Sequence, residues 1–261
     1  MGSVTVPLAS RLPVLTYHSL DDSGSPISIA PHQFRWQMQR LQADGWRTLT
    51  LDELLAGHAR GAWPSRTFAL TFDDGFENFA EHALSVLGDC GFSATLFIVA
   101  DWVGRTNDWP GQVSWVPRWP LLTWDRLCAI SQAGVEIGGH SLSHVSLTRI
   151  PLDVAQREIV DCRRVLEDRI GHPARSFAYP YGESSEQLRR IVAANFDAGF
   201  GTRLGFATAG SSAVSLDRID MYYLRAPFLF RSLEAGWLDA YLGLRRWGRD
   251  ARRVERKVMP W

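Results

Sequence analysis

Short apolar runs alternate along the chain with longer segments of helical periodicity. The apolar runs cover residues 12–18, 66–74, 93–101, 134–140, 174–182 and 198–203. Apolar residues at three- and four-residue spacing predict helices near 31–44, 76–90, 123–133, 151–169 and 184–196. Several of these segments begin at residues that commonly cap helices, such as Thr123 and Ser184 or Ser185. The alternation predicts a parallel sheet, either an open α/β layer or a barrel, and the absence of repeats or low-complexity linkers predicts one domain over 1–261.

Polar residues gather where the apolar runs end. In a parallel barrel the carboxyl ends of the strands share one face, and active sites form on that face. The pattern therefore predicts that side chains far apart in sequence meet there. They are His18, Asp73, Asp74, Asp101, His140 and Tyr181.

The segment "HSLSH" provides candidate metal ligands. It places His140 and His144 four residues apart, a spacing at which two imidazoles share one side of a helical turn. Asp74 could add a carboxylate oxygen. Two histidines and one carboxylate leave coordination positions open for water and substrate, as a catalytic site requires. We expect zinc in this site, with iron, manganese, cobalt or nickel as alternatives.

The segment "LTFDDGF" at residues 70–76 places two aspartates side by side at the end of an apolar run. Successive strand residues point in opposite directions, so both carboxylates can face one site only if the strand breaks there, and Gly75 permits the turn. We expect Asp74 to bind the ion and Asp73 to act as general base for a water activated by the ion. Either motif alone has an ordinary interpretation, as a turn or as a solvated helix face.

Composition narrows the class of protein. The chain has 46% apolar and 21% charged residues, and its 28 basic and 28 acidic residues balance, so no global charge favours a nucleic-acid partner. The three cysteines (Cys90, Cys128 and Cys162) form no CxxC pair, which argues against a disulfide framework and suits a reducing compartment. The first 20 residues lack the pattern of a secretory signal peptide, so we expect a cytoplasmic protein by default. A leader that was removed from the natural precursor is the alternative.

Three motifs together resemble a known family. "TFDDG" (71–75), "HSLSH" (140–144) and "AYPYG" (178–182) are similar to the motifs of polysaccharide deacetylases of the NodB-homology type, carbohydrate esterase family 4. The resemblance covers roughly residues 10 to 220. It implies a distorted (β/α) barrel with fewer than eight strands and metal-dependent removal of an N-acetyl group from a sugar. It also implies that Asp73 is the base and that Asp74, His140 and His144 are the metal ligands.

The resemblance implies further roles around this set. Ser141 would fix the histidine loop, and the Tyr181 backbone N–H, held by the rigid turn at Pro180, would stabilise the oxyanion. The chain departs from the family in two places, because no histidine follows His172 to act as acid, and Ala178 stands where an arginine usually orients the base.

The first of these departures has a counterpart in one subgroup of the family. "VLTYHSLDD" (14–22) resembles the poly-N-acetylglucosamine deacetylases, in which the acid histidine lies near the N-terminus. We therefore expect His18 to protonate the leaving amine. The alternative is a histidine that is merely hydrogen-bonded at a strand end.

A tryptophan-rich segment follows the third apolar run. It spans residues 101–124, has little helical or strand periodicity, and is expected to cover the active face. Indole rings bind sugar faces well, but they also pack under loops, and the two roles can fall to different rings. The candidate sugar-binding residues are Asp101, Trp102, Trp109 and Trp115.

The C-terminal segment, about 232–261, is basic and holds Trp237, Trp247 and Trp261. Its apolar residues recur at helical spacing up to about Trp247. Such a segment could contact an anionic membrane surface, or it could be a helix packed on the barrel with a solvated charged face.

Three functions fit the sequence. The first is a metal-dependent N-deacetylase acting on an N-acetylated glycan, which could be lipid-linked. The second is a glycan-binding protein without turnover, which is supported by Ala178 in place of the arginine that is usual in the family. The third is a deformylase or amidase acting on a lipid-linked or small amide. The oligomeric state is left open by the sequence.

Overall fold

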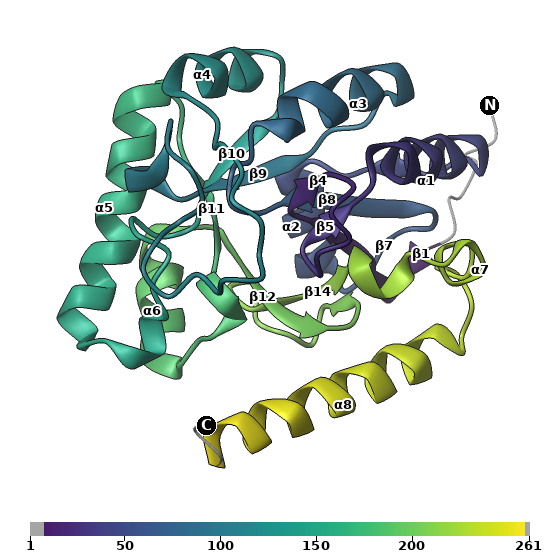
Figure 1. Ribbon diagram of the computed structural model, residues 1–261. Coiled ribbons are helices and arrows are strands. Elements are labelled where there is room, and N and C mark those ends of the chain that lie inside the picture. Colours follow the sequence, from purple (N-terminus) through teal and green to yellow (C-terminus); the bar gives the residue numbers. More distant parts are fainter. Residues whose placement is uncertain (1–7, 259–261) are drawn as a thin grey trace.

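Parallel strands form a closed barrel at the centre of the computed structural model, which describes residues 8–258 and the side chains of 8–250. Seven strands within this range pair in the order β3-β14-β12-β11-β10-β9-β8, and a β3–β8 pairing closes the ring (Figure 1). They are β3 Val14–Tyr17, β8 Thr67–Phe72, β9 Thr95–Ile98, β10 Glu136–Gly139, β11 Ser176–Ala178, β12 Ala198–Leu204 and β14 Leu216–Asp220. The fold is therefore the expected (β/α) barrel with fewer than eight strands.

Helices surround the barrel and connect its strands (Figure 1). They are α1 Pro31–Ala43, α2 Leu51–Arg60, α3 Leu84–Cys90, α4 Trp124–Gln132, α5 Leu152–Ile170, α6 Glu186–Asn195, α7 Pro227–Phe230 and α8 Leu238–Val258. A π-helical segment, Phe79–Ala83, leads into α3. Two-residue strands complete the chain: β1 Leu8–Ala9 with β7 Trp63–Pro64, β2 Arg11–Leu12 with β13 Ala207–Thr208, β4 Ser19–Leu20 with β5 Ser28–Ile29, and β6 Arg47–Thr48 beside β8.

The barrel interior changes from apolar to polar along the strands. One buried cluster combines strand residues such as Val14, Ala69 and Leu216 with Leu51 and Trp63 from the segments around α2. These two segments close the end of the barrel where the strands begin. Alternate residues of each strand face inward. Beyond this apolar cluster the next inward-facing positions are polar, and the last inward-facing positions lie at the end of the barrel where the strands finish.

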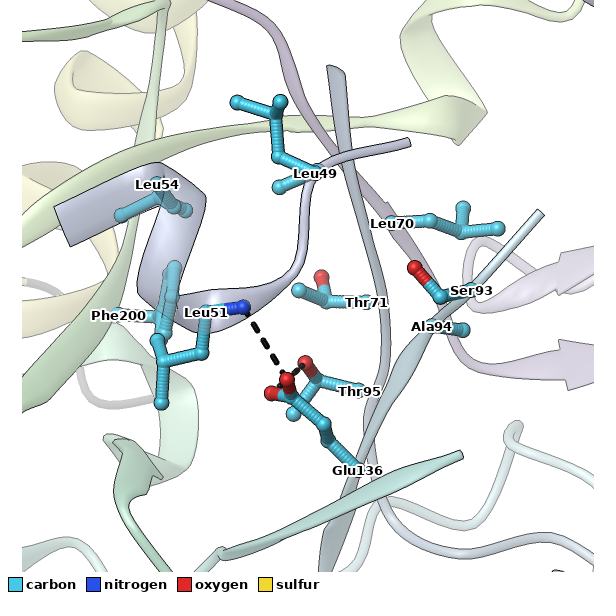
Figure 2. Close-up of a pocket in the computed structure, with 11 residues that line it drawn as sticks. Leu49, Leu51, Leu54, Leu70, Thr71, Ser93, Ala94, Thr95, Glu136 and Phe200 are labelled. Carbon is cyan, nitrogen blue, oxygen red and sulfur yellow. Dashed lines mark hydrogen bonds between the residues drawn. The ribbon is translucent and has the colours of Figure 1, made fainter. Parts of the chain in front are cut away.

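A small cavity lies at this closed end, between the start of α2 and strands β8 to β10 (Figure 2). Glu136 accepts hydrogen bonds there from the Leu51 backbone N–H (3.1 Å) and from the Thr95 hydroxyl (3.3 Å). The carboxylate thereby accepts from one of the N–H groups that have no partner within the helix at the start of α2. Its negative charge also interacts favourably with the helix dipole. The contacts tie α2 to the barrel and account for Glu136 as a structural residue.

The hydrophobic pattern predicts most of these elements. All six apolar runs contain a barrel strand, and all five predicted helices form, with Thr123 and Ser185 as N-caps that accept from Arg126 and Leu188. The pattern did not predict α2 or β14. The three cysteines are free, in agreement with the sequence.

The C-terminal segment forms α8, which runs beside β12 at the edge of the barrel (Figure 1, yellow). Leu238 and Leu242 of this helix are buried, which confirms packing on the barrel. Trp261 lies outside the described residues. Among the described helices, none is long and apolar enough to cross a membrane.

Candidate active site

The break after β8 turns both aspartates toward the same end of the barrel. The strand ends at Phe72, and Asp74 and Gly75 both have left-handed backbone conformations, with φ of 74° and 75°. Five non-glycine residues of the described chain have positive φ, and four of them (Asp74, Ser141, His144 and Tyr181) lie in this site. Such conformations cost free energy and cluster where function requires them.

Three candidate metal ligands meet at this end. Asp74 Oδ1 lies 3.4 Å from His140 Nε2 and 3.3 Å from His144 Nε2, and the three side chains are buried. One ligand atom from each lies within 4.8 Å of the others. The set comes from the ends of β8 and β10 and from the loop after β10, as the sequence predicted.

The hydrogen bonds of this set indicate that a cation fits between the three atoms. The His140 Nδ1–H donates to the Ala178 carbonyl at 2.7 Å, which leaves a lone pair on Nε2. Asp74 Oδ1 is buried without a hydrogen-bond partner in the described structure. A nitrogen lone pair and a carboxylate oxygen that face each other without a proton donor are an arrangement that a metal ion satisfies.

The histidine loop is fixed by its own hydrogen bond. The His144 backbone N–H donates to Ser141 Oγ at 2.9 Å, and Ser141 is completely buried. The His144 imidazole also lies between two aromatic rings, with centroids 4.3 Å from Trp109 and 4.8 Å from Tyr181. These contacts orient the second histidine of the candidate ligand set.

Asp73 is held by an arginine that the sequence analysis missed. The Arg218 guanidinium donates to both carboxylate oxygens of Asp73 at 2.7 Å each, and the two residues are 1% and 2% exposed. Arg218 also donates to the Gly201 carbonyl at 2.7 Å. It reaches Asp73 from β14, because β14 lies next to β3 and β3 next to β8 in the closed barrel.

Arg218 changes the interpretation of Ala178. The family resemblance suggested that Asp73 lacks its orienting arginine, whereas the structure supplies a bidentate arginine from another strand. Burial alone would raise the pKa of Asp73, but Arg218, with His140 and His18, lowers that pKa below its usual value. The carboxylate is therefore ionised at neutral pH and aimed at the site.

His18 lies beside Asp73. It follows β3, its side chain is 19% exposed, and its Nε2 is 3.8 Å from Asp73 Oδ2. Asp220, at the end of β14, is close enough that the His18 charge lowers its pKa, although burial raises it more. Asp220 was also missed, because β14 was not predicted.

The turn after β11 is sterically restricted. Tyr181 has a φ of 58°, and the following Gly182 has a φ of 66°. A Cβ at Gly182 would lie 1.9 Å from Thr202 Oγ1 and 2.5 Å from the Thr202 backbone nitrogen, so only glycine fits. Pro180 is buried at the start of the same turn.

The tryptophan-rich segment divides into packed and exposed rings. Trp109 is 2% exposed and joins a buried cluster with Phe76, Val99 and Leu121, so neither face of its ring is open to a sugar. Trp102 packs against that cluster. Trp115 is 58% exposed.

An open groove of about 930 Å³ lies beside the candidate ligands. Trp115 lines it, whereas Trp102, Trp109 and Asp101 are not among its lining residues in the described structure. Other residues along the groove are Arg149, Tyr181, Glu183, Tyr223 and Arg249.

The fold is a closed parallel barrel, the site gathers three candidate ligands for a metal ion at one end of it, and comparisons with known proteins give the family. The family model described as polysaccharide deacetylase matches residues 60–197, more than half of the chain, so the chain belongs to the polysaccharide deacetylase family.

Curated relatives agree with this assignment, and a solved structure shows the same fold. The chain is 26% identical to YxkH of Bacillus subtilis strain 168 over 212 residues, which are 80% of this chain and 71% of YxkH. It is 25% identical to the poly-beta-1,6-N-acetyl-D-glucosamine N-deacetylase of Staphylococcus epidermidis, over 73% of this chain and 64% of that protein. The structure of IcaB from Ammonifex degensii superposes with a TM-score of 0.73 at 24% identity, covering 88% of this chain and 98% of IcaB, and shows the same fold.

Proposed function

We propose that this protein hydrolyses N-acetyl groups on an N-acetylglucosamine-containing glycan. The observation that carries this proposal is the convergence of Asp74, His140 and His144 beside an Asp73 carboxylate that Arg218 holds by both oxygens. The names of homologous proteins support the substrate class, since they include a peptidoglycan N-acetylglucosamine deacetylase and poly-β-1,6-N-acetyl-D-glucosamine deacetylases.

Asp74, His140 and His144 are assigned as the ligands of a divalent ion, with zinc as the first choice because two imidazoles and one carboxylate form a common catalytic zinc set. When bound, such an ion acts as a Lewis acid that polarises the acetyl carbonyl and makes a water molecule more acidic. Cobalt, manganese, iron and nickel accept the same ligands and are alternatives.

Asp73 and His18 are assigned as base and acid. Asp73 removes a proton from the attacking water while the water oxygen bonds to the acetyl carbon. His18 then donates a proton to the amide nitrogen as the C–N bond breaks, so that acetate and a free amine leave. The 3.8 Å between His18 Nε2 and Asp73 Oδ2 supports this assignment, since two groups this close can both act on one acetamido group.

Tyr181 and the groove are assigned to the substrate. The Tyr181 backbone N–H is proposed to donate to the oxyanion, since the strained turn at Pro180 and Gly182 fixes its direction. Trp115, exposed along the groove, is proposed to contact a sugar face, and the groove volume allows more than one sugar ring.

The alternatives to this proposal are a glycan-binding protein without turnover and an amidase or deformylase. Arg218 supplies the arginine that Ala178 does not, which removes the sequence support for a glycan-binding protein without turnover. A deformylase or small-amide amidase has no specific observation in its favour.

The zinc-loaded protein is incubated with N-acetylglucosamine oligomers, with lipid-linked N-acetyl sugars and with small N-acetyl and N-formyl amides. Acetate and formate release are then measured. Acetate from the oligomers, lost in Asp73→Asn, supports the proposal. Release only from formyl or small amides contradicts it, and so does no release from any substrate by a metal-loaded protein.

A further inference from the structure

The part of helix α8 whose side chains are described, Leu238 to Asp250, packs against the barrel by one side. Leu238 and Leu242 are 0% and 1% exposed. On the same side, the Tyr241 hydroxyl donates to the Tyr223 carbonyl at 3.1 Å, and Arg249 donates to the Thr202 carbonyl at 2.7 Å. These contacts attach the helix firmly along the edge of the barrel.

The opposite side of α8 carries an exposed apolar stripe. It consists of Trp237, Ala240, Leu244 and Trp247, and the three large side chains are 49%, 65% and 71% exposed in that order. Trp237 belongs to the helical turn that opens α8, since its carbonyl accepts from the Tyr241 N–H. The spacing of three and four residues keeps this stripe on one face of the helix, turned away from Leu238 and Leu242.

We propose that this stripe docks on an anionic lipid surface. Two exposed tryptophans and a leucine on one face of a helix are typical of segments that lie in the membrane interface. The sequence of α8 holds seven arginine or lysine residues and three acidic residues, in a chain whose 28 basic and 28 acidic residues otherwise balance. This local excess of positive charge is complementary to an anionic lipid surface.

Charge also distinguishes a lipid surface from a second copy of the chain. Pairing two α8 stripes would bring two helices with the same net positive charge together, which disfavours that interface. An anionic surface instead gains from the same charge. Because no described helix can cross a membrane, α8 lies on the surface in this proposal.

Docking through the stripe also places the substrate groove near the lipid. Arg249 of α8 lines the groove, while the stripe lies on the other side of the same helix. The groove would therefore lie about one helix diameter, roughly 10–12 Å, from the lipid surface.

The test is co-sedimentation with vesicles, and its readout does not depend on any deacetylase activity. The full chain is mixed with vesicles of equal parts phosphatidylglycerol and phosphatidylcholine, and separately with phosphatidylcholine alone. The test variant is Leu244→Ser/Trp247→Ser. The matched control is Trp115→Ser, which removes an exposed tryptophan outside α8. Circular dichroism and the unfolding midpoint establish that each variant is folded, and Trp247→Ser alone serves if the double variant is not.

We expect binding to the anionic vesicles that weakens at high salt, that falls roughly tenfold or more in the double variant, and that is unchanged in the Trp115→Ser control. No binding by the wild type, or equal binding by the double variant, overturns the proposal. The proposal is also overturned if sedimentation velocity shows a wild-type dimer that is dissociated in the double variant, while neither protein binds vesicles. The stripe would then be a contact between two copies of the chain.

Discussion

Replacing Arg218 by methionine removes the only bidentate partner of Asp73 in the described structure while keeping a side chain of similar length. Both residues are almost completely buried, so solvent cannot compensate the carboxylate that remains. Removing one partner of a buried ion pair typically costs about 3–5 kcal/mol of folding free energy. For a chain of this size such a loss lowers the unfolding midpoint by about 10 °C.

The same substitution changes the pH dependence of turnover. In the wild type the pKa of Asp73 is held below its usual value, so the ion pair stabilises the fold above the unfolded pKa and is lost as pH falls through the folded pKa. Without Arg218, burial is opposed only by the imidazoles, and the pKa of Asp73 rises. We therefore expect the acid limb of kcat/KM to move to higher pH in the Arg218→Met variant, and its stability deficit to shrink on acidification.

The assays are thermal unfolding across pH and kcat/KM for acetate release from an N-acetylglucosamine oligomer. Arg203→Met is the matched control, because Arg203 also pairs with an aspartate at 2.8 Å but is 63% exposed, and it should cost less than about 1 kcal/mol. The double variant Asp73→Asn/Arg218→Met should regain much of the stability without activity. An acid limb identical to that of the wild type, or a destabilisation no larger than that of Arg203→Met, would refute this reasoning.

Three further predictions concern other parts of the site. His18→Ala should lower kcat by about 10²- to 10⁴-fold without changing the bound metal, and near-normal turnover would exclude it as the acid. Gly182→Ala should lower the unfolding midpoint and kcat, because its Cβ meets Thr202, and an unchanged midpoint would contradict the contact. Trp115→Ala should raise KM without changing the stability. Trp109→Ala should cost about 3–5 kcal/mol of stability and weaken metal binding. The opposite result for either ring would contradict the roles assigned to them.

The sequence predicted the turn that carries both aspartates, because the reasoning there was local. A strand that ends in two carboxylates and a glycine can present both to one site only by breaking, and the left-handed conformations of Asp74 and Gly75 confirm this. The spacing of His140 and His144 indicated the right pair, since both reach the Asp74 carboxylate. The helical turn inferred from that spacing was wrong, because the segment is an irregular loop in which Ser141 and His144 have left-handed backbone conformations.

Arg218 could not be predicted by the same reasoning. It stands in the middle of the five-residue strand "LDRID", and charged residues at alternate positions are usual on solvent-exposed strands. Only the closure of the barrel turns this position inward, toward Asp73. The signal that remains in the sequence is the run Leu216, Arg218 and Asp220 at inward spacing, which has meaning once the partner strand is known.

The C-terminal segment shows how two interpretations of one helix can concern different faces. The apolar spacing fits either packing on the barrel or contact with a membrane surface. The structure shows that Leu238 and Leu242 pack on the barrel while Leu244 and Trp247 are exposed. The sequence could not separate the two sets because it does not show which side of α8 meets the barrel.

Elemental analysis after zinc loading tests whether Asp74, His140 and His144 form a metal site. His58→Ala is the matched control, because that histidine is hydrogen-bonded to the Ser211 carbonyl away from the three ligands. We expect about one equivalent of metal in the wild type and in His58→Ala, and loss of metal in folded His140→Ala. Equal metal content in all three proteins, or no metal in any of them, would contradict it.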